Sequence, residues 1–209
     1  MIRYMYTSNI DLATIEHLAK EMPEKRLSDY QQLAKVGDKV NNIVSFLLLK
    51  QYCQENGYET EITYGNDGKP YIQNNPFFFN ISHSDGIVAV AFDNDEVGMD
   101  IEKIKDVDQD IAGILYSDIE KEKYSTLLTE SKTFYKAWVM KESYTKMLGK
   151  GLYIEFKDLT LNLEEDNSTI NEYNINSYII DDYFLAITTK KSEINIEKIE
   201  LDELLRRIQ

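Results

Sequence analysis

The chain has 209 residues, of which 43% are hydrophobic and 29% charged, a composition typical of a globular protein that buries a core. Its length allows one domain or two small ones. Acidic residues outnumber basic ones by 37 to 23, which gives a formal net charge of −14. This charge argues against general nucleic-acid binding, because phosphate neutralisation needs a basic surface. Any phosphate site must therefore be built from locally gathered lysines.

Cysteine usage and the N-terminus indicate the compartment. The single cysteine, Cys53, cannot form an intramolecular disulfide, and no Cys-x-x-Cys zinc spacing occurs. We expect a buried thiol in a reducing environment. Residues 1–6 do not form a basic region followed by an apolar run, and no apolar stretch reaches the length of a membrane span. These features predict a cytoplasmic protein without a membrane segment.

The first half of the chain mixes helix and strand patterns. Residues 36–52 predict a helix, because apolar side chains recur there every three or four residues. These are Val40, Ile43, Val44, Leu47 and Leu48. Another helix is predicted at 11–21. The predicted strands are 1–6, 60–64, 77–82, 87–92 and 96–102. A turn at residues 93–95, Asp-Asn-Asp, suggests that the last two strands form a hairpin.

The second half has a similar content. The predicted helices are 117–128, 132–148 and 199–208, and the predicted strands are 159–163, 174–180 and 184–189. Residues 164–176 are predicted to form a solvated loop or a hairpin. Mixed helices and hairpins favour the α+β class. We expect two tightly packed halves, residues 1–102 and 103–209, each with a small antiparallel sheet and helices.

A pair of carboxylates two residues apart is the first chemical signal. Asp100 and Glu102 lie on a predicted strand, so both side chains leave the same face. Gly98 just before them allows close approach of another backbone. Carboxylate and phosphate oxygens are the ligands that Mg²⁺ prefers. A solvated acidic strand end explains the pair equally well when it is taken alone.

A second signal lies on the predicted helix 132–148. Trp138, Glu142 and Lys146 recur every four residues, so they form one line along the helix. Taken alone, Glu142 and Lys146 suit a surface ion pair of small energy. The only tryptophan of the chain beside them suggests a partly dry groove instead. Glu142 in such a groove suits a metal ligand or a general base.

Short polar donors gather at the end of the predicted strand 77–82. His83 is flanked by Ser82 and Ser84, and such a cluster can hold phosphate. Lys69 follows a glycine-containing turn, and Lys25 precedes the helix at 36–52. The other histidine, His17, lies on a predicted helix, where a structural role is the simpler explanation.

Taken in order, these segments resemble the 4′-phosphopantetheinyl transferase family. The similarity is greatest to its larger, single-chain class, typified by the surfactin-synthetase-activating enzyme, and runs from about Pro23 to Leu152. The segments that carry it are Gly68-Lys69-Pro70, Phe79-Asn80-Ile81-Ser82-His83-Ser84, Gly98-Met99-Asp100-Ile101-Glu102, and Trp138 with Lys141-Glu142-Ser143 and Lys146.

The resemblance implies a reaction and a fold. Enzymes of this family move the phosphopantetheine arm of coenzyme A onto a serine of an apo acyl or peptidyl carrier protein and release adenosine 3′,5′-bisphosphate. The reaction uses Mg²⁺, and Mn²⁺ is an alternative. The implied fold is two similar α+β halves related by a pseudo-twofold axis, with the active site between them. A monomer is expected from this architecture.

The resemblance also implies roles for individual residues. The implied metal ligands are Asp100, Glu102 and Glu142. Glu142, or a water held by it or by Glu120, would take the serine proton, and Lys146 would neutralise charge on the pyrophosphate. The implied coenzyme A contacts are Lys25, Lys39, Lys69, Ser82, His83, Lys141 and Lys146. Three positions depart from the family pattern: Lys39 replaces an arginine, Ser28 a lysine, and Ile104 a small polar residue.

We expect the carrier protein to dock near residues 104–120. This segment mixes charged residues with apolar ones, Ile111, Ile114, Leu115 and Tyr116, which could equally form an ordinary core stripe. Carrier proteins are commonly acidic, as is this chain, so docking should depend on apolar contacts and local lysines.

Two other functions are compatible with the same residues. A metal-dependent phosphoesterase acting on a nucleotide or pyrophosphate could use the same carboxylates and lysine, although it would leave the Ser-His-Ser segment without a role. A non-enzymatic module, with the acidic strand as a solvated face, would bind no metal. Such a module would tolerate Glu142→Gln with only small changes in stability.

Overall fold

The computed structural model describes residues 1–65, 68–107, 114–149 and 154–208. The chain forms two compact units. The first unit comprises residues 1–94 and 194–209, and the second comprises residues 95–193. The division thus follows Asn94 rather than residue 102, and the C-terminal segment belongs to the first unit. The α+β class is confirmed, whereas the pseudo-twofold relation stays a prediction.

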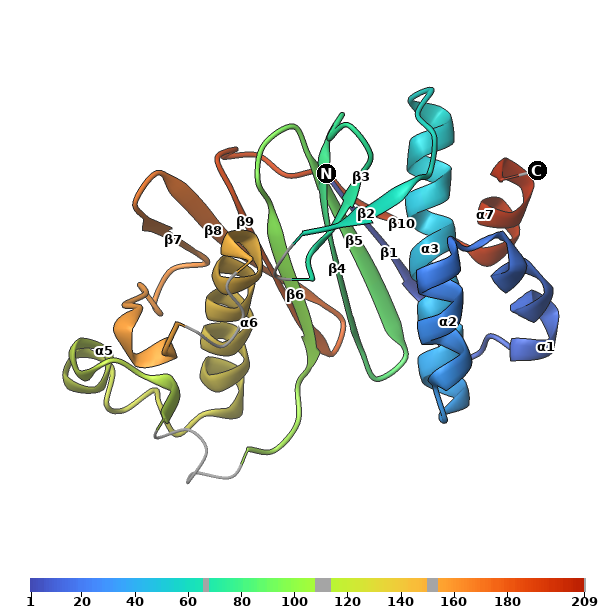
Figure 1. The fold of residues 1–209 in the computed structure, drawn as a ribbon. Coiled ribbons are helices and arrows are strands. Elements are labelled where there is room, and N and C mark those ends of the chain that lie inside the picture. The colour runs from blue at the N-terminus through green and yellow to red at the C-terminus, as the bar shows by residue number, and fades with distance from the viewer. Residues whose placement is uncertain (66–67, 108–113, 150–153, 209) are drawn as a thin grey trace. The chain divides into compact units, whose positions relative to one another are not determined.

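The first unit is built on a four-stranded sheet with the order β10-β1-β5-β4 (Figure 1). Its strands are β1 (Ile2–Tyr6), β4 (Phe78–Ser84), β5 (Ile87–Asp93) and β10 (Ile196–Lys198). β1 pairs antiparallel with β5 and parallel with β10, and β4 pairs antiparallel with β5. The β4–β5 turn contains Asp85 and Gly86, both at positive φ, as two-residue hairpin turns require. A separate hairpin joins β2 (Ile62–Tyr64) to β3 (Pro70–Ile72).

Helix α3 (Val36–Glu55) supplies the core of the first unit and packs on β5 (Figure 1). The predicted apolar stripe is confirmed, since each of its five members is at most 2% exposed. The predicted helix 11–21 is a short α1 (Leu12–Ile15) continued by the 3₁₀ helix η1 (Glu16–Glu21). Helix α2 (Glu24–Gln32) was not predicted. Helix α7 (Leu201–Arg207) packs on α3.

The second unit has a four-stranded antiparallel sheet with the order β6-β9-β8-β7. Its strands are β6 (Gly98–Lys103), β7 (Asn167–Ile170), β8 (Tyr173–Ile180) and β9 (Tyr183–Thr189). Helix α6 (Ser131–Leu148) packs on β6 and β9, and it ends at Gly149, which has a φ of 67°. Further helices of this unit, among the described residues, include α5 (Asp118–Lys123) and the 3₁₀ helix η3 (Phe156–Asp158). Of the two predictions for residues 164–176, the hairpin is confirmed.

Two strand predictions were wrong. The segments 87–92 and 96–102 do not form a hairpin, because β5 and β6 belong to different sheets and residues 93–95 carry the chain from one unit to the other. Residues 159–163 do not form a strand. Leu159, Leu161 and Leu163 are all buried, which imitates a half-buried strand, but the Leu161 N–H donates to a carboxylate of Glu120 instead of a neighbouring strand.

Cys53 lies on α3 with no exposed surface, so the predicted buried thiol is confirmed. Burial raises the pKa of this thiol, which keeps it protonated and weakly nucleophilic. Among the described helices, none combines the length and hydropathy that crossing a bilayer requires.

Candidate active site

Asp100 and Lys146 meet through the packing of α6 on β6. Asp100 is in the middle of β6 and only 3% exposed. Lys146 lies in the last turn of α6, and its Nζ donates a hydrogen bond to Asp100 Oδ1 at 2.6 Å. Two segments separated by 46 residues in the sequence therefore contribute opposite charges to one place, as their motifs predicted.

Glu142 joins this pair one helical turn before Lys146. Its carboxyl group is half-buried, and burial raises its pKa, with the Lys146 charge opposing and the Asp100 charge reinforcing the shift. Asp100, Glu142 and Lys146 thus form one electrostatically coupled group, here called the acidic cluster. A partly desolvated carboxylate with a raised pKa is a better proton acceptor than an ordinary glutamate at neutral pH.

Glu102 completes the predicted metal ligands. It is half-buried on β6, two residues after Asp100 and opposite Phe184 of β9, so it shares a face of the strand with Asp100. Within residues 1–65, 68–107, 114–149 and 154–208, no three His, Cys, Asp or Glu side chains already form a metal-holding group. The chemistry of the donors nevertheless fits Mg²⁺, since all three side chains offer carboxylate oxygens and two of them belong to the acidic cluster.

Glu120 and Lys141 form a second ion pair, with both side chains fully buried. Lys141 Nζ donates to Glu120 Oε2 at 2.6 Å and to the carbonyl oxygens of Leu115 and Phe156 at 2.9 and 3.0 Å. Burial lowers the pKa of Lys141, and the neighbouring Glu120 carboxylate opposes that shift. The pair and these two further bonds therefore tie α6 to α5, to η3 and to the helical residue Leu115 of the second unit.

The same glutamate caps helix α5. Its Oε2 accepts from the Ser117 N–H at 2.7 Å, while the Glu120 N–H donates to Ser117 Oγ at 3.2 Å. This capping box is signalled in the sequence by a serine three residues before a glutamate, a signal that the sequence analysis missed. The contacts of Glu120 stabilise the fold of the second unit. The predicted roles of Glu120 in proton transfer and of Lys141 in coenzyme A binding stay predictions.

The first unit holds the remaining predicted phosphate ligands. Lys25 lies on α2 with its Nζ 3.7 Å from the centre of the Tyr64 ring. Lys39 lies on α3 with its Nζ 5.5 Å from the Tyr30 ring. Such cation–π contacts position an ammonium group while part of it stays in water. Neighbouring Arg26 is buried, and burial lowers its pKa to about 10.

Strand β4 carries Ser82 and His83 near its end, beside the turn at Asp85 and Gly86. Ser82 is buried and His83 is exposed, as the alternation of a strand dictates. Lys69, immediately before β3, is 8% exposed and lies 5.8 Å from the Tyr71 ring. These three residues remain candidate ligands for the phosphates of coenzyme A.

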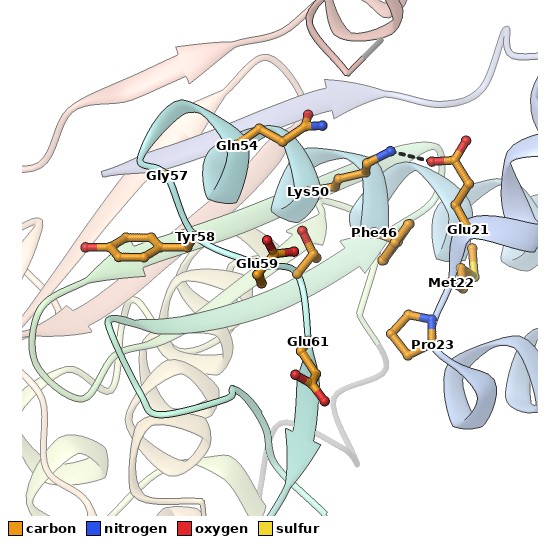
Figure 2. Close-up of a pocket in the computed structure, with 11 residues that line it drawn as sticks. Glu21, Met22, Pro23, Phe46, Lys50, Gln54, Gly57, Tyr58, Glu59 and Glu61 are labelled. Carbon is orange, nitrogen blue, oxygen red and sulfur yellow. Dashed lines mark hydrogen bonds and ion pairs between the residues drawn. The ribbon is translucent and has the colours of Figure 1, made fainter.

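A large cavity of the first unit does not contain the predicted site. It has a volume of about 1000 Å³ and is lined by none of the predicted site residues. Figure 2 shows Glu21, Glu59 and Glu61 around it, together with Lys50, which is paired with Glu21. Glu21 and Lys50 neutralise each other, so Glu59 and Glu61 leave the lining with a negative charge that repels a polyphosphate. The size of this cavity therefore does not indicate a coenzyme A site.

A pocket of about 470 Å³ lies in the second unit beside Trp138. The indole packs against Phe134 and Phe156, with ring centres 5.9 and 5.3 Å away. The pocket is also lined by Ile114 and Lys121. The indole is half-buried, but Glu142 and Lys146 do not line this pocket, so a partly dry groove shared by all three residues stays a prediction.

Comparison with known proteins places the site in a family. Residues 96–195 match the model of the 4′-phosphopantetheinyl transferase superfamily. The chain is 33% identical to the 4′-phosphopantetheinyl transferase psf-1 of Bacillus pumilus over 72% of its own length and 69% of the relative's. It is 39% identical to the transferase ffp of Bacillus subtilis, over 59% of this chain and 56% of that relative.

A third relative, the 4′-phosphopantetheinyl transferase Sfp of Bacillus subtilis strain 168, is 42% identical over 47% of this chain and 46% of its own length. The matches to ffp and Sfp thus cover less than two thirds of those proteins. None of these relatives supports a phosphoesterase. The matched residues 96–195 include the acidic cluster, and the psf-1 match extends over most of both proteins. The chain therefore belongs to the 4′-phosphopantetheinyl transferase superfamily.

Proposed function

We propose that this chain transfers the 4′-phosphopantetheine group of coenzyme A to a serine of an apo acyl or peptidyl carrier protein, as a Mg²⁺-dependent, monomeric, cytoplasmic enzyme. Mn²⁺ is the alternative ion. The observation that carries the proposal is the acidic cluster, which combines Asp100, Glu142 and Lys146 in a member of this family. The cluster supplies carboxylate oxygens for a cation and an ammonium group for phosphate oxygens.

The reaction forms one bond and breaks one bond. The serine oxygen bonds to the phosphorus that carries the pantetheine arm, and the bridging P–O bond to the second phosphate breaks. Adenosine 3′,5′-bisphosphate leaves with that bridging oxygen, and the serine proton passes to a base. Reactions of this type depend mainly on positioning and on neutralising charge on the phosphate oxygens.

Each group of the acidic cluster has a proposed task. Asp100, Glu102 and Glu142 would hold Mg²⁺, which when bound neutralises the pyrophosphate. Lys146 stabilises negative charge that develops on the leaving phosphate. Glu142 accepts the serine proton directly or through a water. Lys25, Lys39, Lys69, Ser82 and His83 of the first unit are proposed to bind the phosphates of coenzyme A.

Mass spectrometry tests the proposed function. The protein is incubated with coenzyme A, Mg²⁺ and several apo carrier proteins, and the carrier mass is followed. A gain of one phosphopantetheine group that disappears with EDTA and in Asp100→Ala supports the proposal. Absence of any gain, together with absence of coenzyme A binding, would refute it.

Lys146→Met is expected to change metal binding and transfer in opposite directions. The ammonium group lies 2.6 Å from Asp100 Oδ1, so its removal makes the cluster more negative and should tighten Mn²⁺ binding several-fold. The transfer rate should fall about 100-fold or more, because charge on the leaving phosphate loses its partner. Electron paramagnetic resonance titration with Mn²⁺ and the carrier assay measure the two effects. Lys190→Met, which removes an exposed lysine paired with Glu172, is the control, and weaker Mn²⁺ binding by Lys146→Met would contradict the prediction.

Carrier docking is proposed at the predicted segment 104–120 and the adjoining Trp138 pocket. Residues 108–113, including Ile111, lie outside the described part of the chain. Leu115 and Tyr116 are core residues, at most 1% exposed, whereas Ile114 and Ile119 are 73% and 62% exposed. Ile114 lines the Trp138 pocket together with Lys121, and Ile119 is a second exposed isoleucine of the same segment. Exposed isoleucines near a lysine suit an apolar anchor on an acidic partner.

Ile119→Asp is therefore expected to raise the KM for the carrier about tenfold and to leave the KM for coenzyme A unchanged, because it replaces an apolar contact by a desolvated charge. Ile179→Asp, at another exposed isoleucine of the second unit, is the matched control. Steady-state kinetics at two salt concentrations measure both effects. Carrier affinity should change little with salt, and a steep loss at high salt would count against apolar docking.

A further inference from the structure

Gly98 begins strand β6 and lies directly against the backbone of α6. A Cβ atom on residue 98 would lie 2.0 Å from the carbonyl oxygen of Ser143 and 2.3 Å from the backbone nitrogen of Met147. Both are backbone atoms of α6, so no side-chain rotation could relieve the overlap. Any larger residue would force the helix and the strand apart by roughly 1.2–1.5 Å, since non-bonded atoms pack at roughly 3.5 Å. Glycine is required here for space.

The turn of α6 that lies against Gly98 carries two members of the acidic cluster, Glu142 and Lys146. Ser143 follows Glu142, and Met147 follows Lys146. Gly98 lies two residues before Asp100 on the same strand. The close contact of the two backbones therefore lies directly beside the place where Lys146 bonds to Asp100 at 2.6 Å.

A hydrogen bond holds the same turn against the sheet. The hydroxyl groups of Ser143 and Thr188 lie 2.8 Å apart, and both side chains are buried. Thr188 is the partner of Gly98 in the pairing of β6 with β9. Gly98, which has no side chain, and Thr188, which bonds to α6, thus both contact the same turn of that helix.

We propose that Gly98 is a positioning residue, because the absence of its side chain sets the spacing between β6 and α6 and thereby brings Asp100 to Glu142 and Lys146. The importance of this spacing for catalysis rests on the proposed function, whereas the spacing itself follows from geometry. A displacement of about 1 Å at a reacting centre can cost about 100-fold in rate. A cation held by carboxylates from both elements would lose affinity for the same reason.

The test compares Gly98→Ala with wild type in Mn²⁺ binding, with no carrier or coenzyme A present. The Mn²⁺ dissociation constant is expected to rise at least tenfold, and circular dichroism establishes that the variant is folded. In the carrier assay the kcat should fall about 100-fold, while the KM for coenzyme A stays within twofold. Gly37→Ala is the matched control, since a Cβ there meets nothing within 4 Å.

Thr188→Val provides a second test that inserts no atom between β6 and α6. It keeps the side-chain volume and removes the hydroxyl bond to Ser143, so Mn²⁺ affinity should fall about threefold. The proposal is overturned by a folded Gly98→Ala that binds Mn²⁺ like wild type. If Gly98→Ala does not fold, wild-type affinity in Thr188→Val overturns it, and so does a wild-type protein that binds no Mn²⁺. Failure of carrier modification alongside the expected Mn²⁺ results would refute only the proposed function.

Discussion

Glu142→Gln is expected to lower the rate of carrier modification by about 10²–10⁴-fold, the range lost when a general base is removed. Glutamine keeps the shape of the side chain but neither accepts a proton nor offers a charged oxygen to a cation. The loss should appear in kcat, because this carboxylate acts on the reacting groups and not on the remote parts of coenzyme A. The mass-spectrometric carrier assay measures it under saturating coenzyme A.

Stability should change in the opposite direction. The folded-state pKa of Glu142 is raised above its ordinary value, first by burial, so folding favours the protonated form. That contribution is complete below the ordinary carboxyl pKa and is lost as the pH rises through the raised pKa. At neutral pH, Glu142→Gln should therefore melt at the same or a higher temperature than wild type, and the difference should shrink in acid.

Glu172→Gln is the matched control, because Glu172 forms an exposed pair with Lys190. It should alter neither the rate nor the melting temperature appreciably. A Glu142→Gln protein that is fully active, or that loses activity only because it unfolds, would contradict the assignment of Glu142 to the reaction.

Glu120→Ala is expected to lower the free energy of unfolding by about 3–5 kcal/mol, the cost of leaving one partner of a buried ion pair uncompensated. Both partners have no exposed surface. The change would also remove the acceptor for the N–H groups of Ser117 and Leu161. Urea unfolding followed by Trp138 fluorescence measures the loss.

Adding Lys141→Met to Glu120→Ala should recover part of that loss, since two apolar side chains replace a buried pair at little cost. Glu172→Ala, in an exposed pair, should cost no more than about 1 kcal/mol. A loss of unfolding free energy below about 1 kcal/mol for Glu120→Ala would contradict a structural role for Glu120. If Glu120→Gln abolished transfer without loss of stability, the predicted role of Glu120 in proton transfer would be supported instead.

The sequence indicated which residues form the acidic cluster but not how close together their side chains lie. Local backbone geometry places Asp100 and Glu102 on one face of a strand. It likewise places Glu142 and Lys146 on one face of a helix. The 2.6 Å bond between Lys146 and Asp100 depends on how α6 packs on β6. Gly98 suggested that packing, although a glycine in a strand pattern does not identify its neighbour.

Local periodicity similarly determined α3 and α6, because an apolar stripe repeating every three or four residues suits only one regular structure. The pattern of Leu159, Leu161 and Leu163 was ambiguous, since alternating burial requires only alternating environments. The backbone N–H of Leu161 donates to a buried carboxylate instead of to a neighbouring strand. No local sequence signal distinguishes these two kinds of partner.

The sequence by itself determined the α+β class, the long helices, the buried Cys53 and the chemical types gathered at the motifs. Only the tertiary structure decided that β5 and β6 enter different sheets, that β10 pairs with β1, and that Lys141 and Glu120 satisfy each other in the core. The physical reason is the range of the interactions. Helix stripes and turns depend on residues a few positions apart, whereas sheet pairing and the partner of a buried charge depend on segments that meet only when the chain is folded.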